Sequence, residues 1–299
     1  MNQKITECII CKKTRLRELK QYDAGELVQC HSCGMIFSSK IPTPTELANH
    51  YKGYAFFSGL SSTTIKRYNQ ILDHFEKYRK TNRILDVGCG EGFFLEQAVK
   101  RGWEAYGTEC VPQYISVCAN KNIKMKEGVL NINDYQAESF DIITSFEVLE
   151  HLHYPVQEVN NFNKLLRKEG LVYITTPNFN SLSRRIQGKS WRVLTYPDHL
   201  CYFAPKTLHS IMKLNSFTKV ELLTTGISFE GLRKNIWGKN TESVDKKDDK
   251  TSSYEPEDRA WQERIEKSIL LRIVKSTLNW VLSITGSGDG IKATYRKLN

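Results

Sequence analysis

Two pairs of cysteines stand near the N-terminus, and each pair has the spacing Cys-x-x-Cys. Cys8 and Cys11 form the first pair, and Cys30 and Cys33 follow after 18 intervening residues. This separation lies within the range expected of a four-cysteine zinc site. Four thiolates in tetrahedral geometry suit structural Zn²⁺, and such an ion has no open position for a substrate. The pattern therefore predicts a zinc ion that holds the local fold and takes no part in a reaction.

Three glycines at alternate positions, Gly88, Gly90 and Gly92, follow an apolar run at 84–87. Because glycine lacks Cβ, the backbone can turn sharply here and approach a bound ligand closely. A segment with helical spacing follows the turn, and the free N–H groups at a helix start can donate to polar or anionic ligand groups. The spacing differs from the dinucleotide fingerprint Gly-x-Gly-x-x-Gly, because Phe93 stands where the third glycine would be.

The acid and the three glycines of this turn resemble the first motif, Asp-x-Gly-x-Gly-x-Gly, of class I S-adenosyl-L-methionine-dependent methyltransferases. The resemblance implies that the cofactor S-adenosyl-L-methionine is bordered by Asp86, Gly88, Cys89, Gly90 and Gly92. Glu109 ends the next predicted strand, about 20 residues after the first glycine, where dinucleotide folds place the carboxylate that accepts the ribose hydroxyls. We therefore expect Glu109 to bind the cofactor ribose.

A second block, Ser-Phe-Asp-Ile-Ile-Thr-Ser-Phe-Glu-Val-Leu-Glu-His, occupies 139–151 and predicts a strand with polar residues at its carboxyl end. The block resembles the fourth-strand region of methyltransferases of the ubiquinone-biosynthesis type. The resemblance implies that the methionine part of the cofactor is bordered by Ser145, Phe146 and Glu147. In some members an acid-acid-histidine set, matched here by Glu147, Glu150 and His151, is linked to a divalent cation. Other relatives with the same residues need no cation. Glu150 and His151 can equally fix the loop by hydrogen bonds, so a cation site and a purely structural role both stay open.

Aromatic residues gather at 178–203, after the fifth predicted strand, without regular periodicity. An aromatic loop on the cleft side of such a sheet predicts a substrate wall. The stretch from Trp191 to Phe203 resembles methyltransferases encoded among bacterial surface-polysaccharide genes. Asp198 and His199 place a histidine beside a carboxylate within it. If the methyl acceptor is a hydroxyl, its proton would go to His151 or His199.

A common scaffold must position these motifs. Predicted strands alternate with predicted helices along the chain, at a spacing that implies a parallel, doubly wound sheet. The predicted fold class is α/β, a Rossmann-like sheet of seven strands with a small N-terminal zinc ribbon. The seven strands are expected at 84–87, 103–109, 123–129, 140–144, 171–178, 219–225 and 291–298.

Five parts are predicted along the chain. They are a zinc ribbon at 1–40, an aromatic-rich linker and N-terminal helix at 41–81, the Rossmann-like methyltransferase core at 82–229, a polar mobile insertion at 230–260, and an amphipathic helix with the last strand of the core at 261–299. The helix at 263–284 has one broad apolar face with basic residues among it, so packing on the domain, pairing with a second subunit and peripheral contact with a membrane all stay open.

The chain of 299 residues has room for one large core plus attachments. A net charge of +10 favours an anionic partner, such as a phosphate-bearing substrate, nucleic acid or an anionic membrane, although such a charge also serves solubility alone. No secretory signal and no run of 18 apolar residues occur in the sequence. A cytoplasmic location is therefore expected, with peripheral contact at the inner face of the membrane left open.

Together these features predict a methyltransferase that uses S-adenosyl-L-methionine and structural Zn²⁺. The polysaccharide-gene resemblance, and the pairing of a zinc ribbon with a methyltransferase in sugar-methylating families, favour O-methylation of a sugar, glycan or nucleotide-sugar in bacterial surface-polysaccharide or related biosynthesis. One alternative is a ribosomal RNA methyltransferase that binds RNA through the ribbon. Against it, the fourth strand lacks the Asn/Asp-Pro-Pro-aromatic motif of many amine-methylating enzymes. A non-catalytic zinc-ribbon binding protein is the other alternative.

Overall fold

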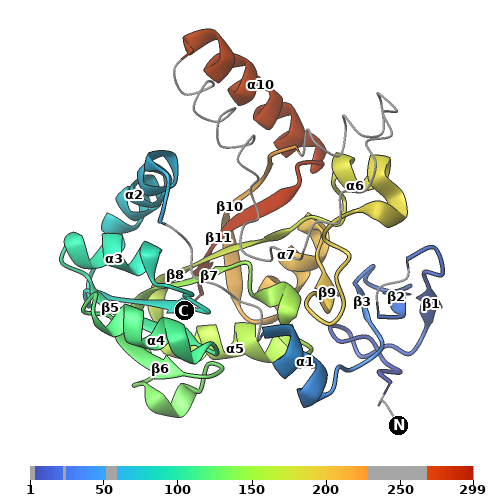
Figure 1. Cartoon of the computed structure of the whole chain (residues 1–299), viewed down its shortest axis with the longest axis horizontal. Coiled ribbons are helices and arrows are strands. Elements are labelled where there is room, and N and C mark those ends of the chain that lie inside the picture. Colours follow the sequence, from blue (N-terminus) through green and yellow to red (C-terminus); the bar gives the residue numbers. More distant parts are fainter. Residues whose placement is uncertain (1–3, 23–24, 52–58, 228–267, 299) are drawn as a thin grey trace.

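The computed structural model describes residues 4–22, 25–51, 59–227 and 268–298 (Figure 1). The predicted insertion at 230–260 lies outside the described residues. So do the first residues of the helix predicted at 263–284 and part of the aromatic-rich linker. Within the described residues, no helix combines the length and the apolar character needed to cross a membrane.

A seven-stranded sheet forms the centre of the molecule, in the order β10-β11-β8-β7-β4-β5-β6. The strands are β4 (Arg83–Val87), β5 (Glu104–Glu109), β6 (Lys124–Glu127), β7 (Phe140–Phe146), β8 (Leu166–Pro177), β10 (Phe217–Thr225) and β11 (Gly290–Lys297). The five from β4 to β8 pair in parallel, and β11 inserts antiparallel between β8 and β10. This confirms the predicted Rossmann-like fold and all seven strands, although β8 begins five residues earlier than expected.

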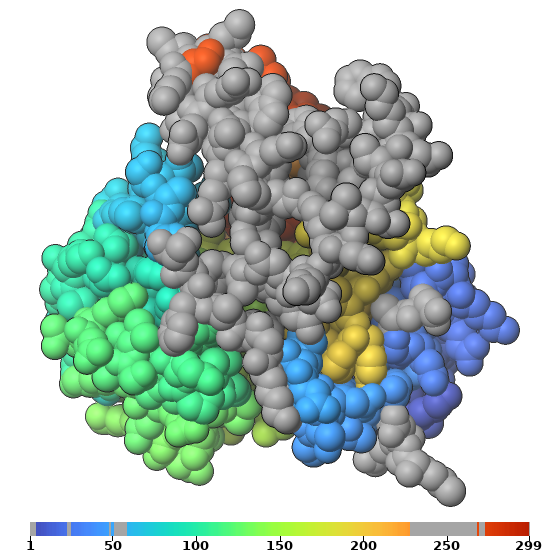
Figure 2. Space-filling model, in the orientation of Figure 1, coloured from blue at the N-terminus to red at the C-terminus, as the bar shows by residue number. Residues whose placement is uncertain are grey.

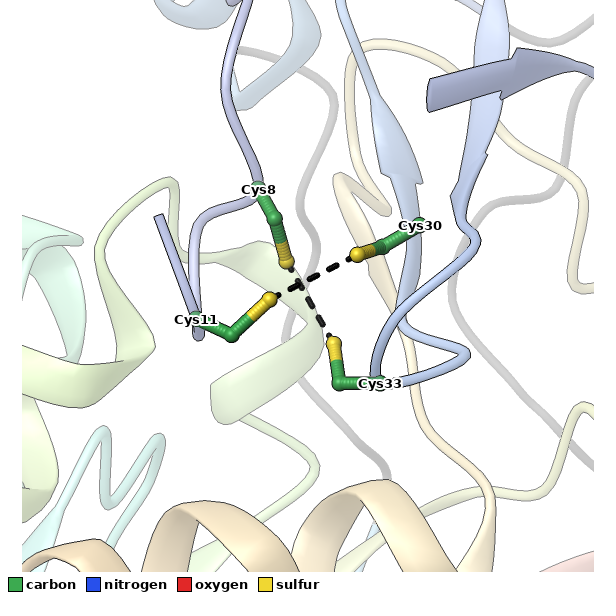
Figure 3. Close-up of side chains that lie close together, drawn as sticks. All are labelled: Cys8, Cys11, Cys30 and Cys33. Carbon is green, nitrogen blue, oxygen red and sulfur yellow. Dashed lines mark hydrogen bonds between the residues drawn. The ribbon is translucent and has the colours of Figure 1, made fainter. Parts of the chain in front are cut away.

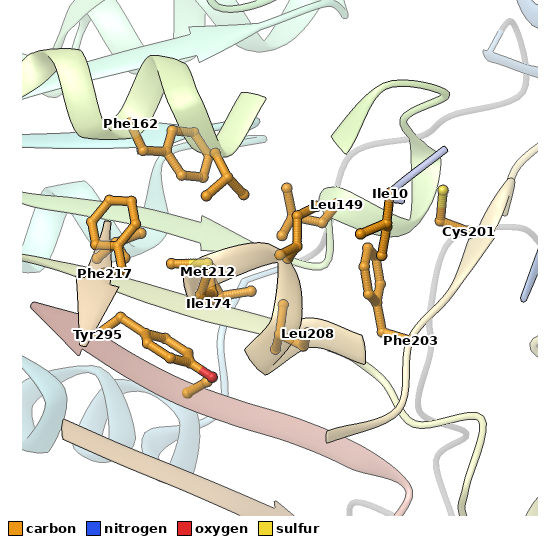
Figure 4. Close-up of a cluster of buried hydrophobic side chains, with 14 of the residues drawn as sticks. Ile10, Leu149, Phe162, Ile174, Cys201, Phe203, Leu208, Met212, Phe217 and Tyr295 are labelled. Carbon is orange, nitrogen blue, oxygen red and sulfur yellow. The ribbon is translucent and has the colours of Figure 1, made fainter. Parts of the chain in front are cut away.

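Helices cover both faces of this sheet, because the central strands are apolar on both sides. They are α2 (Ser62–Glu76), α3 (Phe93–Lys100), α4 (Pro112–Ala119), α5 (Pro155–Leu165), α7 (Pro205–Leu214) and α10 (Ile269–Thr285). On one face, Phe162 of α5 and Met212 of α7 pack against Ile174 and Tyr295 of the sheet (Figure 4). On the other, α2 and α3 cover β4 and β7 through a second apolar cluster.

The C-terminal helix α10 packs along one edge of the sheet. Leu282 is buried, and its carbonyl accepts a hydrogen bond of 2.6 Å from Thr224 Oγ1 of β10. Several apolar side chains of α10 stay exposed, among them Ile273 and Trp280. The described part of the helix thus contacts the core, while the subunit and membrane contacts remain predictions.

A second, four-stranded antiparallel sheet lies beside the core, with the order β1-β2-β3-β9. Its strands are β1 (Leu16–Glu18), β2 (Leu27–Cys30), β3 (Ile36–Ser38) and β9 (Cys201–Tyr202). Three come from the N-terminal unit (residues 4–22 and 25–40), and β9 comes from the aromatic stretch that follows the fifth strand of the core. In the space-filling view this yellow stretch lies between the green core and the blue N-terminal unit (Figure 2).

Aromatic residues of this stretch pack between the N-terminal unit and the core. Trp191 and Tyr202 are 5% and 3% exposed and pack with Leu27 and Ile36 in one apolar cluster. Phe203 is fully buried beside Ile10 (Figure 4). The prediction of an aromatic substrate wall is therefore wrong for Trp191, Tyr202 and Phe203, because their rings are buried in apolar clusters and cannot contact a substrate.

Candidate active site

The glycine turn connects β4 to α3 in a left-handed backbone conformation. Gly88, Gly90 and Gly92 have φ values of +69°, +54° and +70°. A Cβ on Gly88 would lie 2.6 Å from Val148, and one on Gly92 would lie 2.7 Å from Cys118 Sγ, so a larger residue would clash at either position. A Cβ on Gly90 would meet no described residue within 4 Å. The turn is thus closed on its outer glycines and open to a ligand at the middle one.

Glu109 lies at the end of β5, beside this opening. Its Oε2 accepts a hydrogen bond of 2.8 Å from the Gly90 N–H, and its Oε1 accepts from the N–H groups of Cys110 and Val111 at 2.7 and 2.9 Å. Both lone pairs of Oε1 are thus used, and Oε2 keeps one to offer. The carboxylate is therefore fixed against the turn and can still accept a hydrogen bond from a ribose hydroxyl at Oε2.

Asp86 ends β4 on the inner side of the turn and is 3% exposed. Thr144 Oγ1 donates to its Oδ1 at 2.7 Å. Burial raises the pKa of Asp86 to about 7; the Thr144 hydrogen bond opposes this rise, and the charge of Glu109 adds to it. Because the charge of Glu109 acts on Asp86, the two acids favour a cationic ligand. S-adenosyl-L-methionine carries a sulfonium and an ammonium group, so these residues fit it.

Phe146, at the end of β7, forms an aromatic wall with side chains of three other elements. Its ring lies 4.9 Å from that of Phe94, 5.6 Å from that of Tyr173 and 6.1 Å from that of Tyr68 on α2. Burial, with a contribution from the charge of Asp86, raises the pKa of Tyr68 to about 12. The sequence placed Tyr68 only on the apolar face of a helix, and nothing in its spacing marked it as a neighbour of the acid.

The other residues predicted beside the cofactor lie around the same turn. Ser145 is buried, and its Oγ has no hydrogen-bond partner within the described part of the chain. Glu147 is exposed, has φ +54° and donates its backbone N–H to Thr175 O at 3.0 Å. Cys89 is half-buried with its Sγ 3.9 Å from Met125 Sδ. The structure thus gathers every predicted cofactor residue at the carboxyl ends of β4, β5 and β7.

Three histidines surround one carboxylate nearby, and we call His50, His151, Asp198 and His199 the histidine cluster. His151 Nδ1 lies 3.0 Å from Asp198 Oδ1, and His199 Nε2 lies 3.7 Å from Oδ2. His50, on α1 (Pro44–Tyr51), brings Nε2 to 3.2 Å from Oδ1. The sequence predicted Asp198 and His199 as one pair and His151 in a separate motif, whereas His50 was missed because no motif surrounds it.

Burial and charge give the two candidate bases opposite protonation states. Burial alone would lower the pKa of His151, but its hydrogen bond to Asp198 and the charges of Glu150 and Asp198 raise it to about 9. The pKa of Asp198 would rise on burial, yet the His151 hydrogen bond and the nearby histidine charges lower it to about 2. Burial and the charge of His151 lower the pKa of His199. At neutral pH His151 is thus an imidazolium, Asp198 a carboxylate and His199 a neutral imidazole.

The neutral ring is His199, and its tautomer follows from its neighbour. Its Nδ1 lies 2.8 Å from Val193 O, and a carbonyl can only accept, so Nδ1 carries the proton. Nε2 then keeps a lone pair. Of the two predicted bases, His199 is the one with a nitrogen ready to accept a proton at neutral pH.

Glu150 is 2% exposed beside the histidine cluster. Burial and the charge of Glu147 raise its pKa to about 8. Ligand atoms of Glu150, His151 and His199 lie within 4.8 Å of one another, so this group could hold a metal ion, with His199 in the place that the predicted set gave to Glu147. A cation here would have to displace a proton from His151, because a histidine binds metal only when neutral.

The four N-terminal cysteines form a separate, compact group (Figure 3). Cys8 Sγ lies 3.4 Å from Cys33 Sγ, and Cys11 Sγ lies 3.5 Å from Cys30 Sγ. All four sulfurs lie within 4.8 Å of one another. Zn–S bonds of about 2.3 Å in a tetrahedron put sulfurs roughly 3.8 Å apart, so this arrangement could close around one zinc ion.

Hydrogen bonds connect the N-terminal unit to the histidine cluster. Ser38 N–H donates to Leu200 O at 2.8 Å, and Leu200 N–H donates to Glu150 O at 2.7 Å. The register of β3 and β9 pairs Phe37 with Cys201. Leu200 thus bridges the N-terminal unit and the 3-10 turn η2 (Leu149–His151), one residue after His199.

Comparison with known proteins agrees with this geometry. A family model described as "Methyltransferase domain" matches residues 62–222, which is more than half of the chain. The chain belongs to this methyltransferase family. Its fold is similar to the crystal structure of a SAM-dependent methyltransferase from Archaeoglobus fulgidus, with a TM-score of 0.52, 17% identity and coverage of 85% of this chain and 100% of that one. Residues 62–222 therefore form a methyltransferase domain, and the chain shares the fold of that SAM-dependent methyltransferase.

Curated relatives of this methyltransferase include ubiquinone biosynthesis O-methyltransferases. The one from Idiomarina loihiensis is 26% identical over 161 residues, which cover 51% of this chain and 63% of the relative. The one from Nitrosococcus oceani is 34% identical over 105 residues, covering 32% and 44%. The chain thus spans less than two thirds of the length of these relatives. Neither relative is named for RNA, and the RNA alternative gains no support.

Proposed function

We propose that this methyltransferase transfers the methyl group of S-adenosyl-L-methionine to a hydroxyl oxygen of a sugar, glycan or nucleotide-sugar. The observation that carries the proposal is the neutral His199, whose Nε2 lone pair lies beside the Asp198 carboxylate at the edge of the sheet where the cofactor residues gather. A hydroxyl acceptor needs such a base, because its proton must leave as oxygen attacks. The relatives that are named O-methyltransferases agree with oxygen as the attacking atom. The resemblance at 191–203 is the support for a sugar.

Separate residues of the chain bind the cofactor, exclude water and accept the proton. The open face of Gly90 and the carboxylate of Glu109 bind the nucleoside part of the cofactor, and Asp86 faces its positive charge. When bound, the cofactor supplies an electrophilic methyl group. The aromatic wall around Phe146 excludes water from the reacting atoms. His199 takes the hydroxyl proton at Nε2, a step that typically contributes ~10²–10⁴-fold.

Two other members of the histidine cluster, Asp198 and His151, act on His199 through charge. Asp198 stabilises the imidazolium that forms when His199 accepts a proton. Burial and the charge of His151, which is already cationic, keep the pKa of His199 low in the resting enzyme. The ring therefore starts neutral and is charged only during transfer.

The proposal includes a structural Zn²⁺ on Cys8, Cys11, Cys30 and Cys33, within a ribbon at 1–40. Its role would be to hold β3, which pairs with β9 and so fixes the loop that carries Asp198 and His199. A cytoplasmic location would suit an enzyme that modifies sugar nucleotides. The other domain boundaries given above remain part of this proposal.

Methyl transfer from radiolabelled cofactor to a panel of nucleotide-sugars tests the proposal, with a catechol acceptor in parallel. The His199→Gln variant should lower kcat by ~10²–10⁴-fold and leave the Kd of S-adenosylhomocysteine unchanged. His209→Gln is the matched control, because His209 lies on α7 with its Nδ1 3.2 Å from Tyr295 Oη, outside the histidine cluster. Full activity of His199→Gln would refute the role of the base, and transfer to the catechol alone would refute the sugar acceptor.

A further inference from the structure

Helix α1 follows directly after the N-terminal unit, and its start is fixed to the last residue of that unit. Glu46 Oε2 accepts hydrogen bonds from the N–H and the Oγ1 of Thr43 at 2.8 and 3.0 Å, and the Glu46 N–H donates back to Thr43 Oγ1 at 3.2 Å. This reciprocal pair is a capping box, which satisfies free donors at a helix start. Glu46 Oε1 also accepts from Lys40 Nζ at 3.1 Å. Lys40, Thr43 and Glu46 therefore set the direction in which α1 leaves the N-terminal unit.

The same lysine contacts the loop that carries Asp198. Lys40 Nζ lies 4.6 Å from the centre of the Tyr196 ring, a cation–π distance, and Tyr196 stands two residues before Asp198. On the other side of Asp198, the Leu200 carbonyl accepts the hydrogen bond from the Ser38 N–H. Residues of the N-terminal unit thus hold both the start of α1 and the loop around Asp198.

The far end of α1 reaches the histidine cluster. His50 lies in the last turn of α1, and its Nε2 lies 3.2 Å from Asp198 Oδ1. His151 Nδ1, from η2, lies 3.0 Å from the same oxygen. An ionised carboxylate only accepts, so both ring nitrogens present their N–H groups to it. Two imidazoles from two separate elements therefore contact one oxygen of Asp198, and all three side chains are mostly buried.

Contacts on Oδ1 decide where the second oxygen of Asp198 points. Both oxygens turn about the same bond, and the rotational preference of a carboxylate about that bond is broad. With Oδ1 held between His50 and His151, Oδ2 faces His199 at 3.7 Å from its Nε2. Rotation of the carboxylate away from His199 would break two contacts, of which His50 supplies one.

We infer that His50 is a positioning residue for the methyl transfer, which holds the Asp198 carboxylate so that Oδ2 faces His199. The inference rests on the proposed function, in which His199 accepts the proton of the acceptor hydroxyl. A base acts efficiently when a third group orients it. A displacement of about 1 Å, caused by a mutation away from the reacting atoms, can cost about 100-fold in rate. Helix α1 thereby becomes part of the active site, although it lies outside the matched methyltransferase domain at 62–222.

The test compares methyl transfer by the full-length wild type and three single variants. His50→Leu removes both ring nitrogens and should lower kcat roughly 10- to 100-fold, with an unchanged Kd for S-adenosylhomocysteine. His50→Gln places an amide N–H near the position of the ring Nε2 and should restore most of kcat. His74→Leu is the matched control and should behave like wild type, because His74 also lies in the last turn of a helix, α2, beside Phe75 and Tyr78.

A double variant separates positioning from a purely structural role. If His50 acts through Asp198 on His199, the variant that combines His50→Leu with His199→Gln should be no slower than His199→Gln alone. A purely structural role would lower kcat by the same factor in both backgrounds.

A second readout needs no methyl acceptor. In a two-bond ¹H–¹⁵N spectrum of protein with ¹⁵N-labelled histidine and bound S-adenosylhomocysteine, the His199 Nε2 signal responds to the charge beside its lone pair. Asp198 Oδ2 carries that charge. His50→Leu should shift this signal, whereas His50→Gln and His74→Leu should leave it in place. The signal is assigned by its absence in His199→Gln.

Three results would overturn the inference. They are an unshifted His199 signal in His50→Leu, equal fold losses of kcat from His50→Leu in the wild-type and His199→Gln backgrounds, and a loss in His50→Gln as large as that in His50→Leu, which would mean that the ring itself is needed and not its N–H donor. The proposed function fails by a different result. Full activity of His199→Gln would refute the base, while a shifted His199 signal in His50→Leu would still show that His50 acts on it through Asp198.

Discussion

Replacing Asp198 by Asn removes the charge at the centre of the histidine cluster and preserves the shape of the side chain. His151 then loses its main stabilising partner, and burial should drive its pKa down from about 9. A shift of one pKa unit corresponds to about 1.4 kcal/mol. The rise of the His151 pKa from 6.5 to about 9 therefore gives roughly 3 kcal/mol. The fall of the Asp198 pKa from 3.8 to about 2 gives roughly 2.5 kcal/mol.

These two figures describe one interaction from its two partners and are not added. Because Glu150 also raises the pKa of His151, the Asp198 figure is the better measure of the pair. We therefore expect Asp198→Asn to lower the free energy of unfolding by about 2 to 3 kcal/mol where the pair is fully formed. That range is at the lower end of what breaking a buried ion pair costs.

The pH dependence of this loss follows from the direction of each shift. The stabilisation from His151 is complete below its unfolded pKa of 6.5 and is lost as pH rises through about 9. The stabilisation from Asp198 is complete above 3.8 and is lost as pH falls through about 2. The difference between wild type and Asp198→Asn should therefore be largest between pH 4 and 6.5, smaller at 7.5 and near zero at 9.5.

Urea unfolding at pH 5.5, 7.5 and 9.5 measures this difference, with S-adenosylhomocysteine binding as a check of the cofactor site. Asp134→Asn is the control, since Asp134 faces Lys126 at 3.8 Å on the surface and such pairs contribute about 0 to 1 kcal/mol. If the Asp198→Asn difference is the same at pH 5.5 and 9.5, or no larger than that of the control, the described charge state of His151 is wrong.

Three further predictions concern the cofactor turn and the cysteines. Glu109→Gln should weaken S-adenosylhomocysteine binding by about tenfold or more, measured by calorimetry, because the amide has only one accepting oxygen. Gly90→Arg should abolish that binding while circular dichroism shows an intact fold, since the new side chain fills the open space beside the turn; unchanged affinity would contradict this position for the cofactor. Cys33→Ser should release zinc, lower Tm and reduce methyl transfer. Metal analysis and a thermal scan measure this, and a variant that keeps both its zinc and its Tm would contradict the structural zinc site.

The sequence was sufficient for the core because its signals are local. An apolar run, three glycines at alternate positions and an acid at the next strand end lie within single strand–turn–helix units. Backbone sterics and strand alternation then leave few arrangements. Gly90 and Glu109, each predicted beside the cofactor, are in contact in the structure. The four cysteines are local in the same sense, because each Cys-x-x-Cys pair fits one turn.

Contacts between distant segments were not accessible in this way. β9 has only two residues, and its partner Phe37 lies more than 160 residues away, so no periodicity could show the pairing. For this reason the aromatic stretch that contains Trp191 was interpreted as a substrate wall, although packing accounts for its burial. His50 was missed for the same reason, because only the fold brings α1 beside Asp198.

The pairing of β3 with β9 also explains why a zinc-binding unit would accompany this active site. Asp198 and His199 lie in a long irregular segment, and ordering each residue of such a segment costs about 1–2 kcal/mol in backbone entropy. The core supplies part of the opposing contacts, among them the hydrogen bond from Leu200 N–H to Glu150 O in η2. Others come from β3 and from Ser38, which are themselves held in a unit too small to form a large core. A metal that fixes this unit would therefore act on the base at a distance, by limiting the positions open to Asp198 and His199.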